Sequence, residues 1–266
     1  MNTPKDYPWG SYDLNAGESV FWRLGPLNLW CKKVEDELWI GFLYDQEGEE
    51  NNDPNDNPAP PDNLNWERWL LKKGSGKLEL KPAFPDLPVV VKPEYAFRVG
   101  PNAAAKVFVR VPLWVQLNHG NFKVTEIPTV KLSKTWFGNF RKGELCYWIS
   151  SSARRSVTED LIRIYRAVCP IDIRNKSDDE MLIDKICLRV SRLAIFKAAD
   201  QYWGSETKAH FRGHDDMSDL EVSKKPPADA PKAVLVATAR EEHHMSFTAK
   251  TFMSLKELSG IDFFSW

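Results

Sequence analysis

One stretch of the chain, between Lys131 and Arg155, interleaves aromatic and basic side chains densely. Aromatic rings stack against sugars and bases, and guanidinium groups pair with anions, so this mixture is typical of a ligand-binding surface. The pattern also fits a tight turn with packed aromatic residues and a solvated charged face. The candidate ligand-binding residues of this stretch are Trp136, Phe137, Arg141, Glu144, Trp148, Arg154 and Arg155.

A second candidate site is the histidine-bearing segment that begins at His210. His210 and His214 are four residues apart and Asp215 follows, so the three side chains could bind a divalent metal ion if the segment were helical. Gly213 lies between the histidines, however, and the surrounding pattern favours a strand and a turn. Solvent-exposed loop histidines are therefore the competing interpretation.

Other catalytic chemistry has no recognisable motif in the chain. There is no G-x-S-x-G elbow, no glycine-rich nucleotide turn follows a strand, and Glu144 has no second carboxylate beside it in sequence. The four cysteines form no C-x-x-C pair and lie in apolar or alternating stretches, which favours free buried thiols. They are Cys31, Cys146, Cys169 and Cys187. We expect no cofactor.

The overall charge and hydropathy limit the partners of the chain. A formal net charge of −1 gives no general attraction to nucleic acid, so we expect no nucleic-acid partner. The first ten residues lack a basic and an apolar signal region, and no stretch approaches the roughly 20 apolar residues of a membrane span. These features predict a cytoplasmic protein without a membrane span.

Strand signals dominate the elements that must position these residues. Aromatic-rich segments at Ser19–Leu24, Leu27–Lys32 and Glu37–Tyr44 are separated by turn residues and predict an antiparallel meander. The strongest strand signal is Lys106–Leu117, in which Pro112 predicts an edge strand or a bulge. Residues 45–63 are acidic and rich in asparagine and proline, which predicts an exposed loop.

Helical patterns are few and short. Val157–Val168 fits either an amphipathic helix or the beginning of a long strand, and Ser246–Leu258 fits a helix. The predicted fold is mainly β: an antiparallel β-sandwich, or two stacked immunoglobulin-like sandwich units, with one or two short helices. The predicted domains are an N-terminal β domain at residues 1–135 and a C-terminal β-sandwich domain at residues 136–266.

Two segments carry a resemblance to a known family. LSKTWFGNFRKGELCYW at Leu132–Trp148, followed by AVCPIDIRNKSDDEMLIDKICL at Ala167–Leu188, resembles an uncharacterised prokaryotic family known as domain of unknown function 432. The family has no established activity, so the resemblance implies no catalytic residue.

These observations favour a non-enzymatic β-sandwich accessory protein that binds an unknown small ligand or a protein partner. The surplus of aromatic residues, with 11 tryptophans, and the absence of catalytic motifs are the reasons. Two alternatives stay open: a carbohydrate- or ester-processing enzyme on the same scaffold, and a metal-dependent protein that uses the His210/His214 segment.

Overall fold

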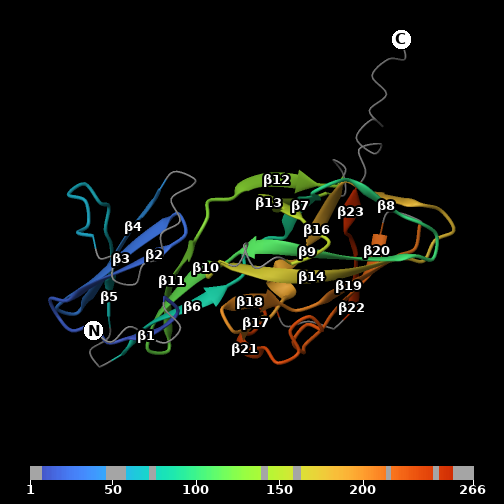
Figure 1. Cartoon of the computed structure of the whole chain (residues 1–266). Coiled ribbons are helices and arrows are strands. Elements are labelled where there is room, and N and C mark those ends of the chain that lie inside the picture. Colours follow the sequence, from blue (N-terminus) through green and yellow to red (C-terminus); the bar gives the residue numbers. More distant parts are fainter. Residues whose placement is uncertain are drawn as a thin grey trace, which may run out of the picture. The chain divides into compact units, whose positions relative to one another are not determined.

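The fold is known from a computed structural model, and β-strands make up most of it (Figure 1). The structure describes residues 8–45, 58–71, 76–138, 143–157, 163–213, 217–241 and 246–253. No α-helix occurs among these residues, and a single short 3₁₀ turn, η2, spans Val190–Arg192. The mainly β prediction is therefore confirmed. No helix in this part of the chain is long and apolar enough to span a membrane.

The chain divides into two compact units. Unit 1 consists of Met1–Ala83 and Pro112–Lys131, and unit 2 consists of Phe84–Val111 and Leu132–Trp266. The chain thus leaves unit 1, enters unit 2 and returns once before completing unit 2. A division into domains at 1–135 and 136–266 stays a prediction.

The first sheet of unit 1 contains the predicted meander. Gly25 and Glu35 both adopt positive φ angles, 61° and 50°, at the two tight turns between successive strands. The pairing is antiparallel throughout, in the order β2-β3-β4-β5. The strands are β2 (Ser19–Leu24), β3 (Leu27–Val34), β4 (Glu37–Tyr44) and β5 (Glu67–Leu70).

The second sheet of unit 1 joins segments far apart in the chain. Its order is β1-β6-β10-β11, and each pair is antiparallel. The core of unit 1 is largely aliphatic, but it also buries Trp22 completely and Trp30 nearly so. The strands are β1 (Gly10–Tyr12), β6 (Leu78–Ala83), β10 (Trp114–His119) and β11 (Phe122–Pro128).

Unit 2 contains a five-stranded sheet that carries several of the candidate residues. Its order is β12-β13-β7-β16-β23, and β13 runs parallel to β7, whereas the other pairs are antiparallel. The strands are β7 (Val89–Pro93), β12 (Ser133–Phe137), β13 (Glu144–Ala153), β16 (Lys185–Leu188) and β23 (Phe252–Met253). A separate two-stranded sheet pairs β8 (Phe97–Val99) with β15 (Met181–Ile183).

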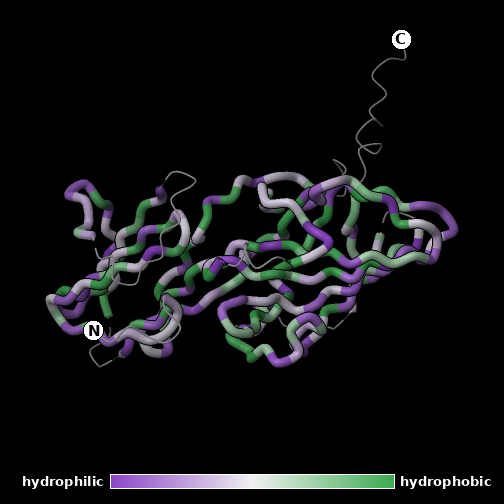
Figure 2. The backbone as a smooth tube through the Cα atoms, viewed as in Figure 1, coloured by the Kyte–Doolittle hydropathy of each residue, from purple (hydrophilic) through white to green (hydrophobic). Residues whose placement is uncertain are grey.

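The largest sheet of unit 2 is built around β14 (Arg166–Asn175). β18 and β19 pair in parallel with successive stretches of β14, and β9 also pairs with it. Hydrophilic and hydrophobic residues alternate along many of these strands (Figure 2). The remaining strands are β9 (Ala104–Pro112), β17 (Ile195–Ala198), β18 (Gln201–Gly204), β19 (Thr207–Phe211), β20 (Met217–Val222), β21 (Val234–Ala237) and β22 (Ser246–Lys250).

The structure differs from the sequence prediction at the expected helices. Ser246–Lys250 forms strand β22 instead of the start of a helix, because it pairs with β20 over five residue positions. Of the ambiguous segment Val157–Val168, residues 158–162 lie outside the described residues, and only Arg166–Val168 belongs to a strand, β14. The parallel pairs of β13 and β14 were also not predicted. Long stretches of chain separate their partners, so the short-turn signals give no information about them.

Candidate functional site

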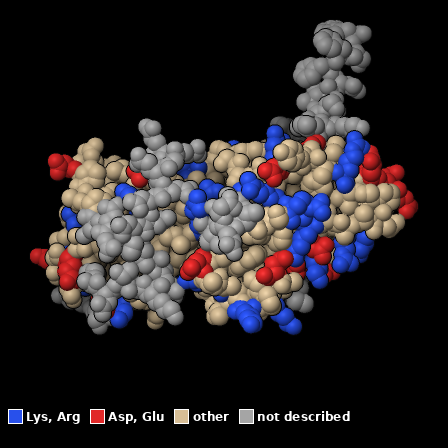
Figure 3. Space-filling view, viewed as in Figure 1, with Lys and Arg blue, Asp and Glu red and all other residues tan. Residues whose placement is uncertain are grey.

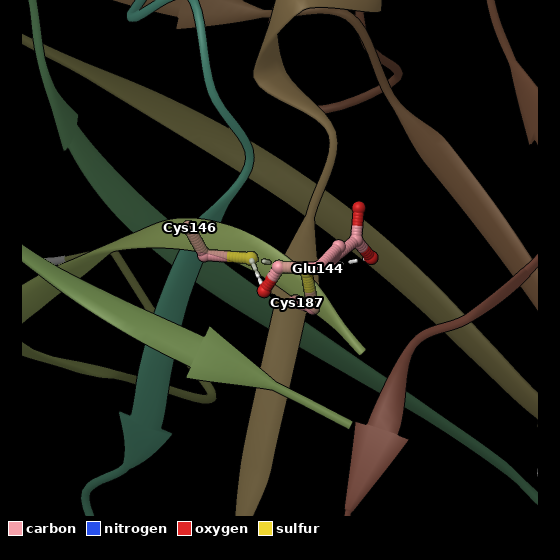
Figure 4. A group of neighbouring side chains, drawn as sticks. All are labelled: Glu144, Cys146 and Cys187. Carbon is pink, nitrogen blue, oxygen red and sulfur yellow. Dashed lines mark hydrogen bonds between the residues drawn. The ribbon is translucent and has the colours of Figure 1, made fainter. Parts of the chain in front are cut away.

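Two buried thiols from different strands of the five-stranded sheet lie side by side in unit 2. Cys146 comes from β13 and Cys187 from β16, and their Sγ atoms are 3.9 Å apart. Both cysteines are at most 1% exposed. Glu144 precedes Cys146 by two residues, so strand alternation directs both side chains to the same face. In Figure 4 the Cys146 sulfur lies beside the backbone oxygen of Glu144, 3.7 Å away, and the Glu144 carboxylate lies toward Cys187.

Glu144 lies between this thiol pair and the positively charged side chain of Arg189. Its Oε1 atom lies 3.9 Å from Cys187 Sγ and forms an ion pair with the Arg189 guanidinium. The Arg189 side chain is 10% exposed and that of Glu144 37% exposed, so the ion pair is half-buried. We name Glu144, Cys146, Cys187 and Arg189 the thiol centre. Among the described residues, its first three members form a His/Cys/Asp/Glu group close enough to hold a metal ion, with ligand atoms within 4.8 Å of one another.

Apolar packing fixes the thiol centre and perturbs its acidity. Cys146 and Cys187 share a buried cluster with Val90 and Phe137, and Trp148 packs against this cluster. Burial raises the pKa of the Cys187 thiol well above its usual range, and the hydrogen bond with Cys146 raises it further. Cys187 is consequently a neutral thiol at neutral pH in the metal-free protein.

A second feature of unit 2 is a pocket lined by two arginines. The backbones of Phe108 and Arg154 form an antiparallel bridge, with N–H to O distances of 2.7 Å and 3.0 Å, which holds the end of β13 beside β9. None of the lining residues is acidic. We name this feature the Arg110–Arg154 pocket; it is lined by Phe108, Arg110, Arg154, Ser156, Val157, Val168 and Gln201.

The charge of Arg154 in this pocket is only weakly compensated by its ion pair. Arg154 Nη2 lies 3.8 Å from Glu94 Oε1, and both side chains are partly exposed, so this ion pair contributes little. Arg154 Nε is buried and has no hydrogen-bond partner among the residues that the structure describes. Basic side chains also gather on one face of unit 2 near β9 (Figure 3).

The structure separates the candidate residues of the basic–aromatic stretch. Phe137, Glu144 and Trp148 lie at or against the thiol centre. Trp136 is 52% exposed on β12. Arg154 lines the other pocket, and the guanidinium carbon of the exposed Arg155 lies 5.8 Å from the centre of the Phe97 ring. Arg141 lies outside the described residues.

The histidine segment is only partly described. His210 lies on strand β19, so the helical geometry that would place the two histidines together is absent at this residue. Its Nε2 atom is 4.0 Å from Glu221 Oε1, and burial and the nearby Lys176 lower the pKa of its imidazole. His214 and Asp215 lie outside the described residues, so the metal prediction for this segment stays a prediction.

Sequence reasoning missed the pairing of the thiols. Cys146 and Cys187 are 41 residues apart, and no short motif links them. The prediction that the cysteines are free and buried is confirmed for all four. Only the order of β13, β7 and β16 brings two of the four together, and no local sequence signal specifies that order.

Fold and site together define an all-β protein whose larger unit holds a buried thiol centre and a separate arginine-lined pocket. The chain belongs to the family described as "Protein of unknown function (DUF432)", whose model matches residues 8–255. The resemblance noted in the sequence is thereby confirmed. No curated protein and no solved structure matches the chain.

Proposed function

We propose that this is a non-enzymatic binding protein that takes a small anionic ligand in the Arg110–Arg154 pocket. The observation that carries the proposal is the lining itself, in which two guanidinium groups occur without an acidic side chain. Guanidinium groups bind carboxylates and phosphates through paired hydrogen bonds, which gives such a pocket a definite preference for oxyanions.

The rest of the lining bears on the polarity of the ligand. Phe108 and Val168 supply apolar surface, whereas Ser156 and Gln201 supply polar groups. Gln201 Nε2 already donates a hydrogen bond to the backbone oxygen of Tyr202 at 2.5 Å, so its amide orientation is fixed. A ligand with one oxyanion group and a short apolar part fits this combination.

Thermal-shift and calorimetric titrations with inorganic phosphate, glycerol phosphate, acetate and butyrate test this proposal. We expect at least one of these anions to raise the melting temperature and to bind with an affinity that falls as salt is added. Arg154→Gln should weaken that binding by about tenfold to a hundredfold, the effect of losing one or two charge-assisted hydrogen bonds.

Arg155→Gln is the matched control, because Arg155 is the next residue and its side chain is exposed outside the pocket lining. This variant should bind the anion as the wild type does. An equal loss of anion affinity in both variants would show that binding depends only on the general surface charge, and it would overturn the proposal. Failure of all four anions to bind the wild-type protein would overturn it as well.

The four free cysteines support a reducing compartment such as the cytoplasm. The carbohydrate- or ester-processing enzyme stays a prediction, and the proposed pocket gives it no added support, because none of the lining residues is a carboxylate or a histidine.

A further inference from the structure

Two of the three distances between ligand atoms in the thiol centre are close to those of a metal site, and all three are within 4.8 Å. Two thiolates bound tetrahedrally to one zinc ion, each about 2.3 Å from the metal, lie about 3.8 Å from each other. The Sγ atoms of Cys146 and Cys187 are 3.9 Å apart. Glu144 Oε1 is 3.9 Å from Cys187 Sγ, within a few tenths of an ångström of the separation expected for an oxygen and a sulfur on the same ion.

A disulfide fits the same two cysteines much less well. A disulfide requires about 2.05 Å between the sulfur atoms, so the two Sγ atoms would have to approach by nearly 2 Å. The two strands are not neighbours, because β7 lies between β13 and β16 in the sheet. Binding one ion between the sulfurs leaves the strands where they are.

Charge balance explains the presence of Arg189. Two thiolates and one carboxylate carry three negative charges, and a divalent ion together with the Arg189 guanidinium carries three positive charges. A buried centre must be close to neutral, because unpaired charge in a low-dielectric interior is costly. Arg189 donates to Glu144 Oε1, the oxygen that also lies near Cys187 Sγ. A carboxylate oxygen has two lone pairs, so Oε1 can bind the ion and still accept the Arg189 hydrogen bond.

The two thiolate ligands favour a soft cation, and the residues around the thiol centre enclose it only in part. Thiolates prefer zinc and other thiophilic ions to magnesium or calcium. Phe137 and Trp148 shield one side of the centre. Cys187 and Arg189 also line a small cavity together with Thr207, Phe247 and Thr251, and the Glu144 side chain is 37% exposed.

We propose that Glu144, Cys146 and Cys187 bind one thiophilic divalent cation, with zinc as the preferred ion and Arg189 as the residue that orients Glu144. Binding converts both thiols to thiolates and releases their two protons to solvent. The three protein ligands leave a fourth position for water or a ligand. This site is separate from the Arg110–Arg154 pocket and does not depend on the function proposed for it.

Zinc content and zinc affinity of the full chain test the proposal. Protein purified from zinc-supplemented cells without chelators should contain about one zinc per chain by elemental mass spectrometry. The apoprotein, titrated with zinc chloride against a competing chelator, should bind one equivalent. Cobalt(II) in place of zinc should produce a thiolate-to-metal charge-transfer band in the near ultraviolet.

Cys146→Ala and Cys187→Ala should each lower zinc affinity at least a hundredfold and remove the cobalt band. Cys169→Ala is the matched control, because Cys169 is equally buried in unit 2 but belongs to β14, outside the thiol centre. Glu144→Gln changes a side chain that is 37% exposed and tests the site even where a cysteine variant fails to fold. It should lower zinc affinity at least tenfold.

Two results would overturn the proposal. The first is a wild-type protein that binds zinc no more tightly than the Cys146→Ala/Cys187→Ala double variant. The second is an equal loss of zinc in Cys169→Ala, which would show that the metal follows unspecific thiol binding. Anion binding by Arg154→Gln and zinc binding by Cys146→Ala are measured independently, so failure of either proposal leaves the other intact.

Discussion

Asn175, at the end of β14, should be among the polar side chains on which unit 2 depends most. The residue is 1% exposed. Its Nδ2 atom donates to the backbone oxygens of Val99, Gly100 and Asp179 at 3.0, 3.1 and 2.7 Å. Its Oδ1 atom accepts hydrogen bonds from the backbone N–H and the hydroxyl of Ser177 at 3.0 and 2.6 Å. One amide therefore ties β14 to the end of β8 and closes its own turn.

Asn175→Ala removes these five contacts, whereas the Gly100 oxygen keeps the Ala103 N–H and the Asp179 oxygen keeps the Ser177 hydroxyl as donors. Each intramolecular hydrogen bond contributes about 0.5–1.5 kcal/mol net to the free energy of unfolding. Because one NH2 group is shared among three acceptors, the five contacts do not add fully, and we expect the free energy of unfolding to fall by about 3–5 kcal/mol. For a protein of this size that loss lowers the melting temperature by about 6–20 °C.

Urea unfolding followed by tryptophan fluorescence measures the loss, and hydrogen exchange of β14 and β15 locates it in unit 2. Asp178→Ala, at an exposed residue of the same turn, is the control and should change stability by less than about 0.5 kcal/mol. Asn175→Asp keeps the acceptor but places an acidic group against three carbonyls, so it should destabilise the protein at least as much as alanine does. A loss below about 1 kcal/mol in Asn175→Ala, or a milder effect of aspartate, would refute this reasoning.

Two further predictions concern Cys169. A Cβ atom at Gly204 would lie 2.6 Å from Cys169 Sγ, so Gly204→Ala should cost about 1–3 kcal/mol in urea unfolding, and adding Cys169→Ala should recover part of that loss. Gly100→Ala has open space and should be nearly neutral, and a cost equal to that at Gly204 would contradict the steric argument. Burial raises the pKa of the Cys169 thiol far above its usual value near 9, so above pH 9 the unfolded chain releases a proton that the folded protein keeps. Because of this thiol, the free energy of unfolding should fall by up to about 1.4 kcal/mol per pH unit as the pH rises. In Cys169→Ala the free energy of unfolding should fall less steeply between about pH 9 and 11, and the same steepness as in the wild type would contradict the role given to Cys169.

Much of the strand content is visible in the sequence because it is a local property. The predicted segments Ser19–Leu24 and Glu37–Tyr44 coincide with β2 and β4. Pro112 marks the end of β9, and the next strand, β10, begins at Trp114. At Pro112 the chain also passes from unit 2 back to unit 1, and the presence of a proline does not by itself predict this passage. The helix prediction is wrong at Ser246–Lys250, because pairing with β20 outweighs a weak local preference, and residues 254–258 of that prediction lie outside the described residues.

The mainly β character of the protein, the burial of its four thiols and its family resemblance can all be predicted from the sequence. Each of these depends on residue type and on neighbours within a few positions. Only the tertiary structure decided that Cys146 meets Cys187 and that Arg154 shares a pocket with Arg110. The physical reason is that strand order and pairing across long stretches of chain choose which side chains meet, and short-range periodicity carries no information about that choice.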